Sequence, residues 1–195
     1  VGGVSEGYCA SLNVGLGAGD DPEAIRENRQ RAVAAVAPGA ALVTLHQVHS
    51  GDAVQADAPW PDEARPRADA LVTDRPGLVL GILTADCTPI LFADPSAGVI
   101  GAAHAGWQGA FAGVIESTLA AMERIGADRA RILAAVGPVI ARKSYEVDDR
   151  FLRRFAEADP ENERFFSPGR EGHHQFDLEA FVLSRLAAGG VTRAE

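Results

Sequence analysis

Apolar segments in the middle of the chain constrain its fold more than any other feature. Positions 78–83 form a nearly continuous apolar run, which predicts a strand buried on both faces. A more polar stretch at 84–88 interrupts this pattern. Two further strands are predicted over 89–93 and 99–104, each followed by turn-forming residues. The centre of the molecule is therefore expected to be β-structure.

Helical periodicity flanks these strands. Asp21 and Pro22 provide the start signal of a helix predicted over 22–37. Between 107 and 125 apolar residues recur at helical spacing, and Gly126 is placed to end that helix. The other predicted elements are strands over 42–48, 71–73 and 131–136, helices over 150–158 and 177–188, and an irregular loop over 56–67. Because strands and helices mix without regular alternation, we expect an α+β fold in which mixed β-sheets form a central core flanked by helices.

Length, charge and cysteine content narrow the class of protein. The 195 residues are expected to form a single domain over 1–195. A net charge of −9 gives no general attraction to phosphate backbones, so no nucleic-acid partner is expected. No apolar run of about 20 residues could span a bilayer, and the first residues do not resemble a signal peptide. Without a spanning segment, no membrane partner is expected. Two cysteines, Cys9 and Cys87, cannot form a disulfide framework, which favours a cytoplasmic location.

Three residues with affinity for metals are predicted to lie at strand ends, namely His49, Cys87 and His104. Two imidazoles and one thiolate suit catalytic zinc, which takes three protein ligands and keeps its fourth position open. Their spacing matches no compact zinc motif. The same residue types also occur as small buried cysteines and as hydrogen-bonded core histidines. The residues alone therefore leave both interpretations open.

A neighbouring histidine, His46, belongs to the same predicted strand as His49. Side chains alternate between the two faces of a strand, so His46 and His49 would point in opposite directions. They could reach one ligand together only if the strand ended or bulged between them. We expect one of the two to be structural.

Short phrases spread over nearly the whole chain resemble, in the same order, the YfiH-like, laccase-domain family. They are Ser11–Gly15, Gly19–Pro22, Glu27–Arg29, Gln47–His49, Asp69–Thr73, Thr84–Pro89, Ala103–Trp107, Gly137-Pro138 and Tyr145–Val147. The most specific are Thr-Ala-Asp-Cys-Thr-Pro and, downstream, His-Ala-Gly-Trp. The chain departs from the family at Gln108, where arginine is usual, and at Val139, where cysteine is common. The family's usual opening and closing segments are absent from this sequence, and the lost arginine removes an expected anion ligand from the loop at 108.

The resemblance implies a zinc site made by His49, Cys87 and His104, with copper as the alternative metal. Purine nucleoside phosphorylase, methylthioadenosine phosphorylase and adenosine deaminase activities have been assigned to the family. The implied partners are therefore a purine nucleoside (adenosine, inosine, guanosine or methylthioadenosine) and phosphate. Members were first described as polyphenol oxidases, but a multicopper oxidase needs about ten histidine ligands and a cysteine. This chain has 5 histidines.

Four further residues are candidates for the site. Arg29 is a candidate for binding phosphate or another substrate oxyanion, because its planar fork suits such groups. Asp86, beside Cys87, is a candidate acid or base, or a support of the metal ligand. Gln47 and Asn13 are candidates for binding substrate. Each also has a structural interpretation, as a solvated helix arginine, a turn carboxylate, a strand hydrogen bond and a turn residue, respectively.

Two other functions are compatible with the same residues. Cys87 could be the nucleophile of a cysteine hydrolase or amidase with a histidine as base, although zinc on the thiolate would suppress its reactivity. A metal-bearing interaction module would need a closed site with four ligands, whereas three candidates are present. His173 and His174 are expected in an exposed polar loop, and Cys9 is expected to have no chemical role. The oligomeric state does not follow from the sequence.

Overall fold

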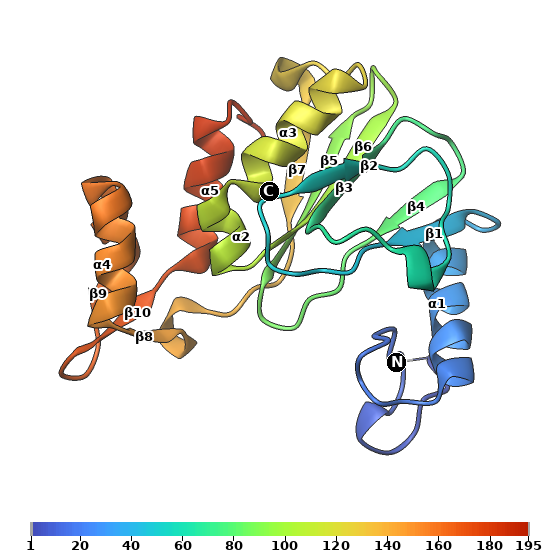
Figure 1. Cartoon of the computed structure of the whole chain (residues 1–195), viewed down its shortest axis with the longest axis horizontal. Coiled ribbons are helices and arrows are strands. Elements are labelled where there is room, and N and C mark those ends of the chain that lie inside the picture. Colours follow the sequence, from blue (N-terminus) through green and yellow to red (C-terminus); the bar gives the residue numbers. More distant parts are fainter. Residues whose placement is uncertain (1, 195) are drawn as a thin grey trace.

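A computed structural model describes residues 2–194 and contains a central five-stranded sheet with two smaller sheets (Figure 1). The helices are α1 (Pro22–Val36), α2 (Trp107–Ala112), α3 (Val114–Arg124), α4 (Asp149–Ala158) and α5 (Leu178–Ala188). The strands are β1 (Ala41–Thr44), β2 (Ala53–Gln55), β3 (Ala70–Thr73), β4 (Leu78–Gly81), β5 (Thr88–Asp94), β6 (Val99–Ala105), β7 (Leu133–Val136), β8 (Glu146–Asp148), β9 (Phe166–Pro168) and β10 (His173–Phe176). This arrangement confirms the α+β prediction. No helix among the described residues is long and apolar enough to cross a membrane.

The central sheet has the strand order β2-β3-β6-β5-β7 and is mixed. β2 and β3 are parallel, whereas β6 is antiparallel to both of its neighbours, β3 and β5. Because of these directions, the beginnings of β3 and β5 lie beside the end of β6. Three chain segments that are distant in sequence therefore meet at one end of the sheet.

Both faces of the central sheet are covered over much of their area. Helices α2, α3 and α5 lie on one face (Figure 1), where Ile90 and Phe92 of β5 belong to the same buried cluster as Leu119 of α3. On the other face, Leu71 of β3 packs in a second cluster with Val43 of β1. The parallel pair β1-β4 and α1 lie on this side. The antiparallel sheet β8-β10-β9 and α4 lie at the opposite end of the molecule from α1 (Figure 1).

The segment before α1 is attached to that helix through one buried amide, Asn28. Its Oδ1 accepts a hydrogen bond from the Val4 N–H. Its Nδ2 lies within hydrogen-bond distance of Ser5 Oγ and of the Ser11 and Asn13 carbonyl oxygens. A buried amide with its polar groups satisfied in this way holds the segment in place.

Two predicted elements are shorter than expected. The helix predicted over 107–125 is divided into α2 and α3 at Gly113, whose φ of 93° is left-handed and interrupts the helical hydrogen bonds. The strand predicted over 42–48 ends at Thr44, where the pairing with β4 ends, and His46 instead forms an isolated bridge with Arg67. His46 and His49 therefore do not alternate on one strand, and the chain changes direction between them.

Two further predictions about environment were wrong. β4 is half-buried rather than buried on both faces, because it pairs only with β1 in a two-stranded sheet. His173 and His174 are half-buried in β10, the middle strand of the sheet β8-β10-β9, and not in an exposed loop. β2, β8 and β9 have only three residues each and were not predicted, since so short a pattern is not distinctive.

Candidate metal centre

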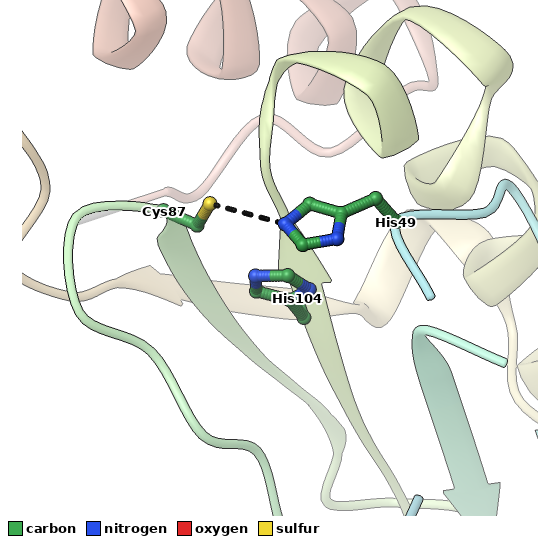
Figure 2. Close-up of side chains that lie close together, drawn as sticks. All are labelled: His49, Cys87 and His104. Carbon is green, nitrogen blue, oxygen red and sulfur yellow. Dashed lines mark hydrogen bonds between the residues drawn. The ribbon is translucent and has the colours of Figure 1, made fainter. Parts of the chain in front are cut away.

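His49, Cys87 and His104 meet at the end of the central sheet where β5 begins and β6 ends. Cys87 directly precedes β5, and His104 is opposite Pro89 in the β5-β6 register. His49 enters from the loop between β1 and β2. One ligand atom from each residue lies within 4.8 Å of the other two, and Cys87 Sγ is 3.9 Å from His49 Nε2 (Figure 2). This geometry is consistent with the prediction that the three residues share one site.

The spacing of the three side chains fits a metal ion. Tetrahedral zinc with one sulfur and one nitrogen ligand places these two atoms about 3.6 Å apart. The 3.9 Å separation of Cys87 Sγ and His49 Nε2 is close to that value. The rings of His49 and His104 are 4.8 Å apart and inclined by 72°, so they approach the centre from different directions. Two histidines and one cysteine could hold a metal here.

A fully buried carboxylate, Asp69, connects the two histidines. One of its oxygens lies 2.8 Å from His104 Nδ1, which leaves His104 Nε2 directed towards the centre. The other oxygen accepts hydrogen bonds from the backbone N–H groups of Val48 and Ser50, at 3.0 and 2.6 Å. A single side chain thus selects the ring orientation of one histidine and holds the turn that carries the other.

The turn at His49 has an unfavourable backbone conformation. His49 has φ of 60°, in the left-handed region that residues with a Cβ seldom adopt. Such a conformation costs about 1 kcal/mol or more and persists where surrounding contacts impose it. The Asp69 carboxylate supplies these contacts on both sides of His49.

Asp69 and His104 each shift the pKa of the other. Burial acts to raise the pKa of Asp69, but the His104 ring and the backbone N–H groups of Ser50 and Val48 outweigh burial and lower it to about 2. For His104, burial opposes protonation, whereas Asp69 and Cys87 raise its pKa to about 9. Asp69 is therefore an anion at neutral pH and accepts a hydrogen bond from Nδ1.

Two glycines allow the loop of His49 to approach α2. A Cβ on Gly106 would lie 2.8 Å from Cys87 Sγ and 3.0 Å from His49 Cδ2. A Cβ on Gly109 would lie 2.9 Å from the Ser50 carbonyl oxygen. The glycine spacing in the segment after His104 thus has a steric reason, because a side chain at Gly106 would displace Cys87 or His49 and one at Gly109 would displace the backbone of Ser50.

Gln47 and Asp86 lie on the two segments that carry His49 and Cys87. The Gln47 amide bonds the Leu83 backbone twice, accepting from its N–H at 2.9 Å and donating to its carbonyl oxygen at 2.7 Å. These bonds connect the segment before His49 to the segment before Cys87. Asp86 is exposed, and its backbone carbonyl accepts from the Ile140 N–H.

Arg29 and Asn13 contact the segment before α1 and are not part of the group formed by His49, Cys87 and His104. Arg29 Nε donates to the Val14 carbonyl oxygen, and its Nη1 lies 3.2 Å from Asp62. Asn13 accepts from the Gly15 N–H in a turn. Arg29 and Val14 line a cavity between α1 and the β1-β4 pair that includes none of His49, Cys87 and His104.

The structure adds residues that the sequence did not single out. Asp69 began one of the phrases that resemble the family but was not a candidate site residue, and its contact with His104 spans 35 positions. Tyr145 is half-buried near Cys87, and burial, together with the charges of Cys87 and Asp86, raises its pKa to about 12. A cavity beside His49 is lined by Trp107 and other residues of α2 and α4.

Comparison with known proteins supports the resemblance. The sequence model of the family described as "Multi-copper polyphenol oxidoreductase laccase" matches residues 1–195. The chain belongs to this laccase-domain family. Among its relatives, the Streptomyces griseus protein named "Purine nucleoside phosphorylase ORF3" is 44% identical over 193 residues, which are 98% of this chain and 77% of that protein. A Streptomyces coelicolor protein that is also named purine nucleoside phosphorylase is 45% identical over 191 residues, 97% of this chain and 78% of its own length.

Solved structures of similar proteins have the same fold. A Neisseria meningitidis protein superposes with a TM-score of 0.89 at 36% identity, covering 100% of this chain and 77% of that one. YlmD from Geobacillus stearothermophilus gives a TM-score of 0.87 at 33% identity, with coverages of 100% and 78%. The Bacillus licheniformis protein YfiH gives a TM-score of 0.86 at 28% identity, with coverages of 100% and 78%, so the mixed sheets described above are those of the YfiH-like fold.

Proposed function

We propose that this chain is a zinc-dependent purine nucleoside phosphorylase acting on a purine nucleoside and inorganic phosphate. The observation that carries the proposal is the meeting of His49, Cys87 and His104 around one point, with His104 oriented by Asp69. The names of the Streptomyces relatives supply the reaction class. Both cysteines are free, which suits a reducing cytoplasm, where we place the reaction.

Phosphorolysis exchanges one bond at the sugar for another. A phosphate oxygen bonds to C1′ of the ribose while the bond from C1′ to N9 breaks and its electron pair leaves with the purine. The proton lost by hydrogenphosphate is taken up by the purine, so the products are the free base and ribose 1-phosphate. A bound zinc ion would supply a Lewis acid for phosphate or ribose oxygens. The same centre is the basis of our further proposal that adenosine is deaminated.

The residues of the chain prepare the site in distinct ways. Asp69 sets the tautomer of His104, and the two hydrogen bonds of Gln47 hold the His49 and Cys87 segments together. Asp86 is exposed beside Cys87 and stays a candidate for proton transfer.

Three other roles stay predictions. Arg29 is proposed as an oxyanion ligand, and Asn13 and Gln47 as substrate-binding residues. All three side chains already make hydrogen bonds within the protein. Substrate binding would therefore have to use their remaining polar atoms or exchange these bonds.

Metal analysis tests the metal part of the proposal. The purified chain is expected to contain about one equivalent of zinc, and Cys87→Ala is expected to lose most of it. Cys9→Ala is the matched control, because Cys9 is the other free cysteine and is not part of the group. Copper in place of zinc would correct the metal, and full retention by Cys87→Ala would remove Cys87 from the ligand set.

A product assay tests the reaction. Adenosine, inosine, guanosine and methylthioadenosine are each incubated with and without phosphate, and free base and the sugar 1-phosphate (5-methylthioribose 1-phosphate for methylthioadenosine) are quantified. Base release is expected only with phosphate. Base release that ignores phosphate would mean hydrolysis, and inosine formed from adenosine would report deamination.

A cysteine hydrolase is the second candidate, because Cys87 Sγ lies 3.9 Å from His49 Nε2, a pair that resembles a nucleophile and its base. Alkylation by iodoacetamide separates the two functions. A zinc thiolate is expected to be protected until a chelator is added, whereas a free nucleophile would react at the same rate with and without chelator.

A further inference from the structure

A cavity of about 470 Å³ opens beside His49 and extends towards α4. It is lined by His49, Trp107, Gln108, Phe111, Ala112 and Arg154. The lining combines one residue of the candidate metal centre, aromatic rings from α2 and one cation from α4. His49 belongs both to the cavity lining and to the candidate metal centre. A molecule in this cavity therefore lies next to the candidate metal centre.

The exposed side chain of Arg154 lies against an aromatic ring. Its guanidinium lies over the Trp107 ring, with Cζ 5.2 Å from the ring centre. Trp107 is in turn fixed by Phe151, whose ring packs edge-on at 4.8 Å. Within residues 2–194 no ion pair joins Arg154 to an acidic side chain. A guanidinium positioned by a ring and not by a carboxylate keeps its N–H donors free for another anion.

The net charge of the chain gives an anionic substrate no general attraction, so a local cation favours its binding. The chain has a net charge of −9, so phosphate is repelled in general. Arg154 is the one arginine or lysine among the residues that line the cavity beside His49. Arg29, the cation predicted from the sequence, lines a separate cavity against α1.

We propose that Arg154 binds the phosphate cosubstrate in the cavity beside His49, which rests on the function proposed above. The guanidinium fork matches phosphate oxygens in pairs, and the Gln108 amide in the same cavity offers a further donor. Phosphate held there lies next to the residues of the metal centre, where C1′ of the nucleoside must also be placed for attack.

Steady-state kinetics test this role with three variants. Arg154→Met removes the charge and keeps the apolar stem over Trp107, and Arg154→Lys keeps the charge without the planar fork. Arg150→Met is the matched control. It removes the same charge from a residue that lies one helical turn away from Arg154 and does not line the cavity beside His49. Loss of charge-assisted hydrogen bonds predicts a KM for phosphate about 10- to 100-fold higher in Arg154→Met. A smaller rise is expected in Arg154→Lys, and none above twofold in the control or in the KM for nucleoside.

Fluorescence provides a readout that does not depend on turnover. The chain has 2 tryptophans, so a Trp60→Phe background leaves Trp107, beneath Arg154, as the only reporter. Titration with inorganic phosphate at constant ionic strength, balanced with chloride, is expected to change the Trp107 emission saturably. Adding Arg154→Met is expected to abolish that change, and adding Arg150→Met to preserve it.

The two measurements separate the possible failures. Wild-type protein that releases no base with phosphate would overturn the proposed function, while the Trp107 titration would still decide whether Arg154 binds phosphate. Phosphorolysis with an unchanged phosphate KM in Arg154→Met, or an identical titration with and without Arg154, would overturn the role of Arg154. Equal effects of Arg154→Met and Arg150→Met would also overturn it, since they would reveal only the general charge of α4.

Discussion

Asp69 shows how much a single buried side chain can determine at this site. Its two oxygens contact His104 and the turn of His49, so the positions of both imidazoles depend on one carboxylate. Groups that orient metal ligands typically contribute a factor of 10 to 100 to metal affinity. The ion pair is fully buried on the Asp69 side, where an unpaired charge would be costly.

Replacing Asp69 is expected to weaken metal binding without removing a ligand. Asp69→Asn keeps the shape of the side chain but presents a weaker acceptor to His104, so zinc affinity should fall about 10- to 100-fold. Competition with a chromogenic chelator measures this affinity, and far-UV circular dichroism verifies the fold. Asp52→Asn, an exposed carboxylate nearby, should have no effect. Unchanged affinity in folded Asp69→Asn would show that the turn and the ring are held by other contacts.

At the scale of elements, the centre depends on how closely the loop of His49 approaches the beginning of α2. Gly106 ends the segment after β6 and serves as the N-cap of α2 with extended backbone, φ −67° and ψ 168°. Any residue can adopt this backbone conformation. Glycine is therefore favoured at position 106 only because it has no side chain. The nearest atoms to a Cβ there belong to Cys87 and His49.

Gly106→Ala is therefore expected to displace two metal ligands without a conformational penalty at Gly106 itself. A contact of 2.8 Å with Cys87 Sγ is shorter than real Cβ contacts, so the sulfur or the helix must move. Zinc content measured after dialysis should drop to less than half, with a smaller change in thermal stability. Gly17→Ala is the control, since nothing lies within 4 Å of a Cβ at Gly17. Equal zinc content in both variants would contradict this account.

At the scale of the whole molecule, a second buried carboxylate stabilises the end of the central sheet away from the metal centre. Asp94, at the end of β5, is fully buried and bonds Arg131 at 3.2 and 3.0 Å. The Asp128 N–H also donates to it at 2.8 Å. The Arg131 hydrogen bonds, followed by the backbone bond from Asp128, lower the pKa of Asp94 to about 2.

The stability that Asp94 contributes should decrease as the pH is lowered. Its carboxyl has a pKa of about 3.9 in an unfolded chain and about 2 in the folded protein. The contribution is thus complete above about pH 4 and is lost as the pH falls through about 2. Asp94→Asn should be less stable than wild type at pH 7, and this difference should shrink on acidification. Urea unfolding at several pH values measures it, with the exposed Asp57→Asn as control. A difference that stays constant down to pH 2 would contradict the ionic origin.

Local sequence signals predicted most elements but not their exact environment. Asp21 accepts from the Glu23 N–H at the start of α1, as the N-cap pattern predicted. The single helix over 107–125 was wrong because periodicity does not register one left-handed glycine, Gly113. The half-buried position of β4 depends on which strand it pairs with, and pairing is not encoded in its apolar run.

The candidate site was also predictable only in part. His49, Cys87 and His104 could be selected from the family resemblance, whereas spacing alone left them ambiguous. Their convergence follows from the antiparallel register of β5 and β6 and from the turn at His49. The contacts of Asp69 and the cavity of Arg154 were not predictable, because they join segments that meet only in the folded chain.

The sequence by itself determined where α1 and α2 begin, which of the longer segments are apolar enough to be strands, and which residue types could bind a metal. These properties depend on neighbours within a few positions along the chain. The tertiary structure alone decided that the His49 backbone is left-handed, that Asp69 reaches His104 across 35 positions, and that Arg154 lies over Trp107. The physical reason is that burial and strand pairing decide which polar groups must satisfy one another, and both arise only when distant segments pack together.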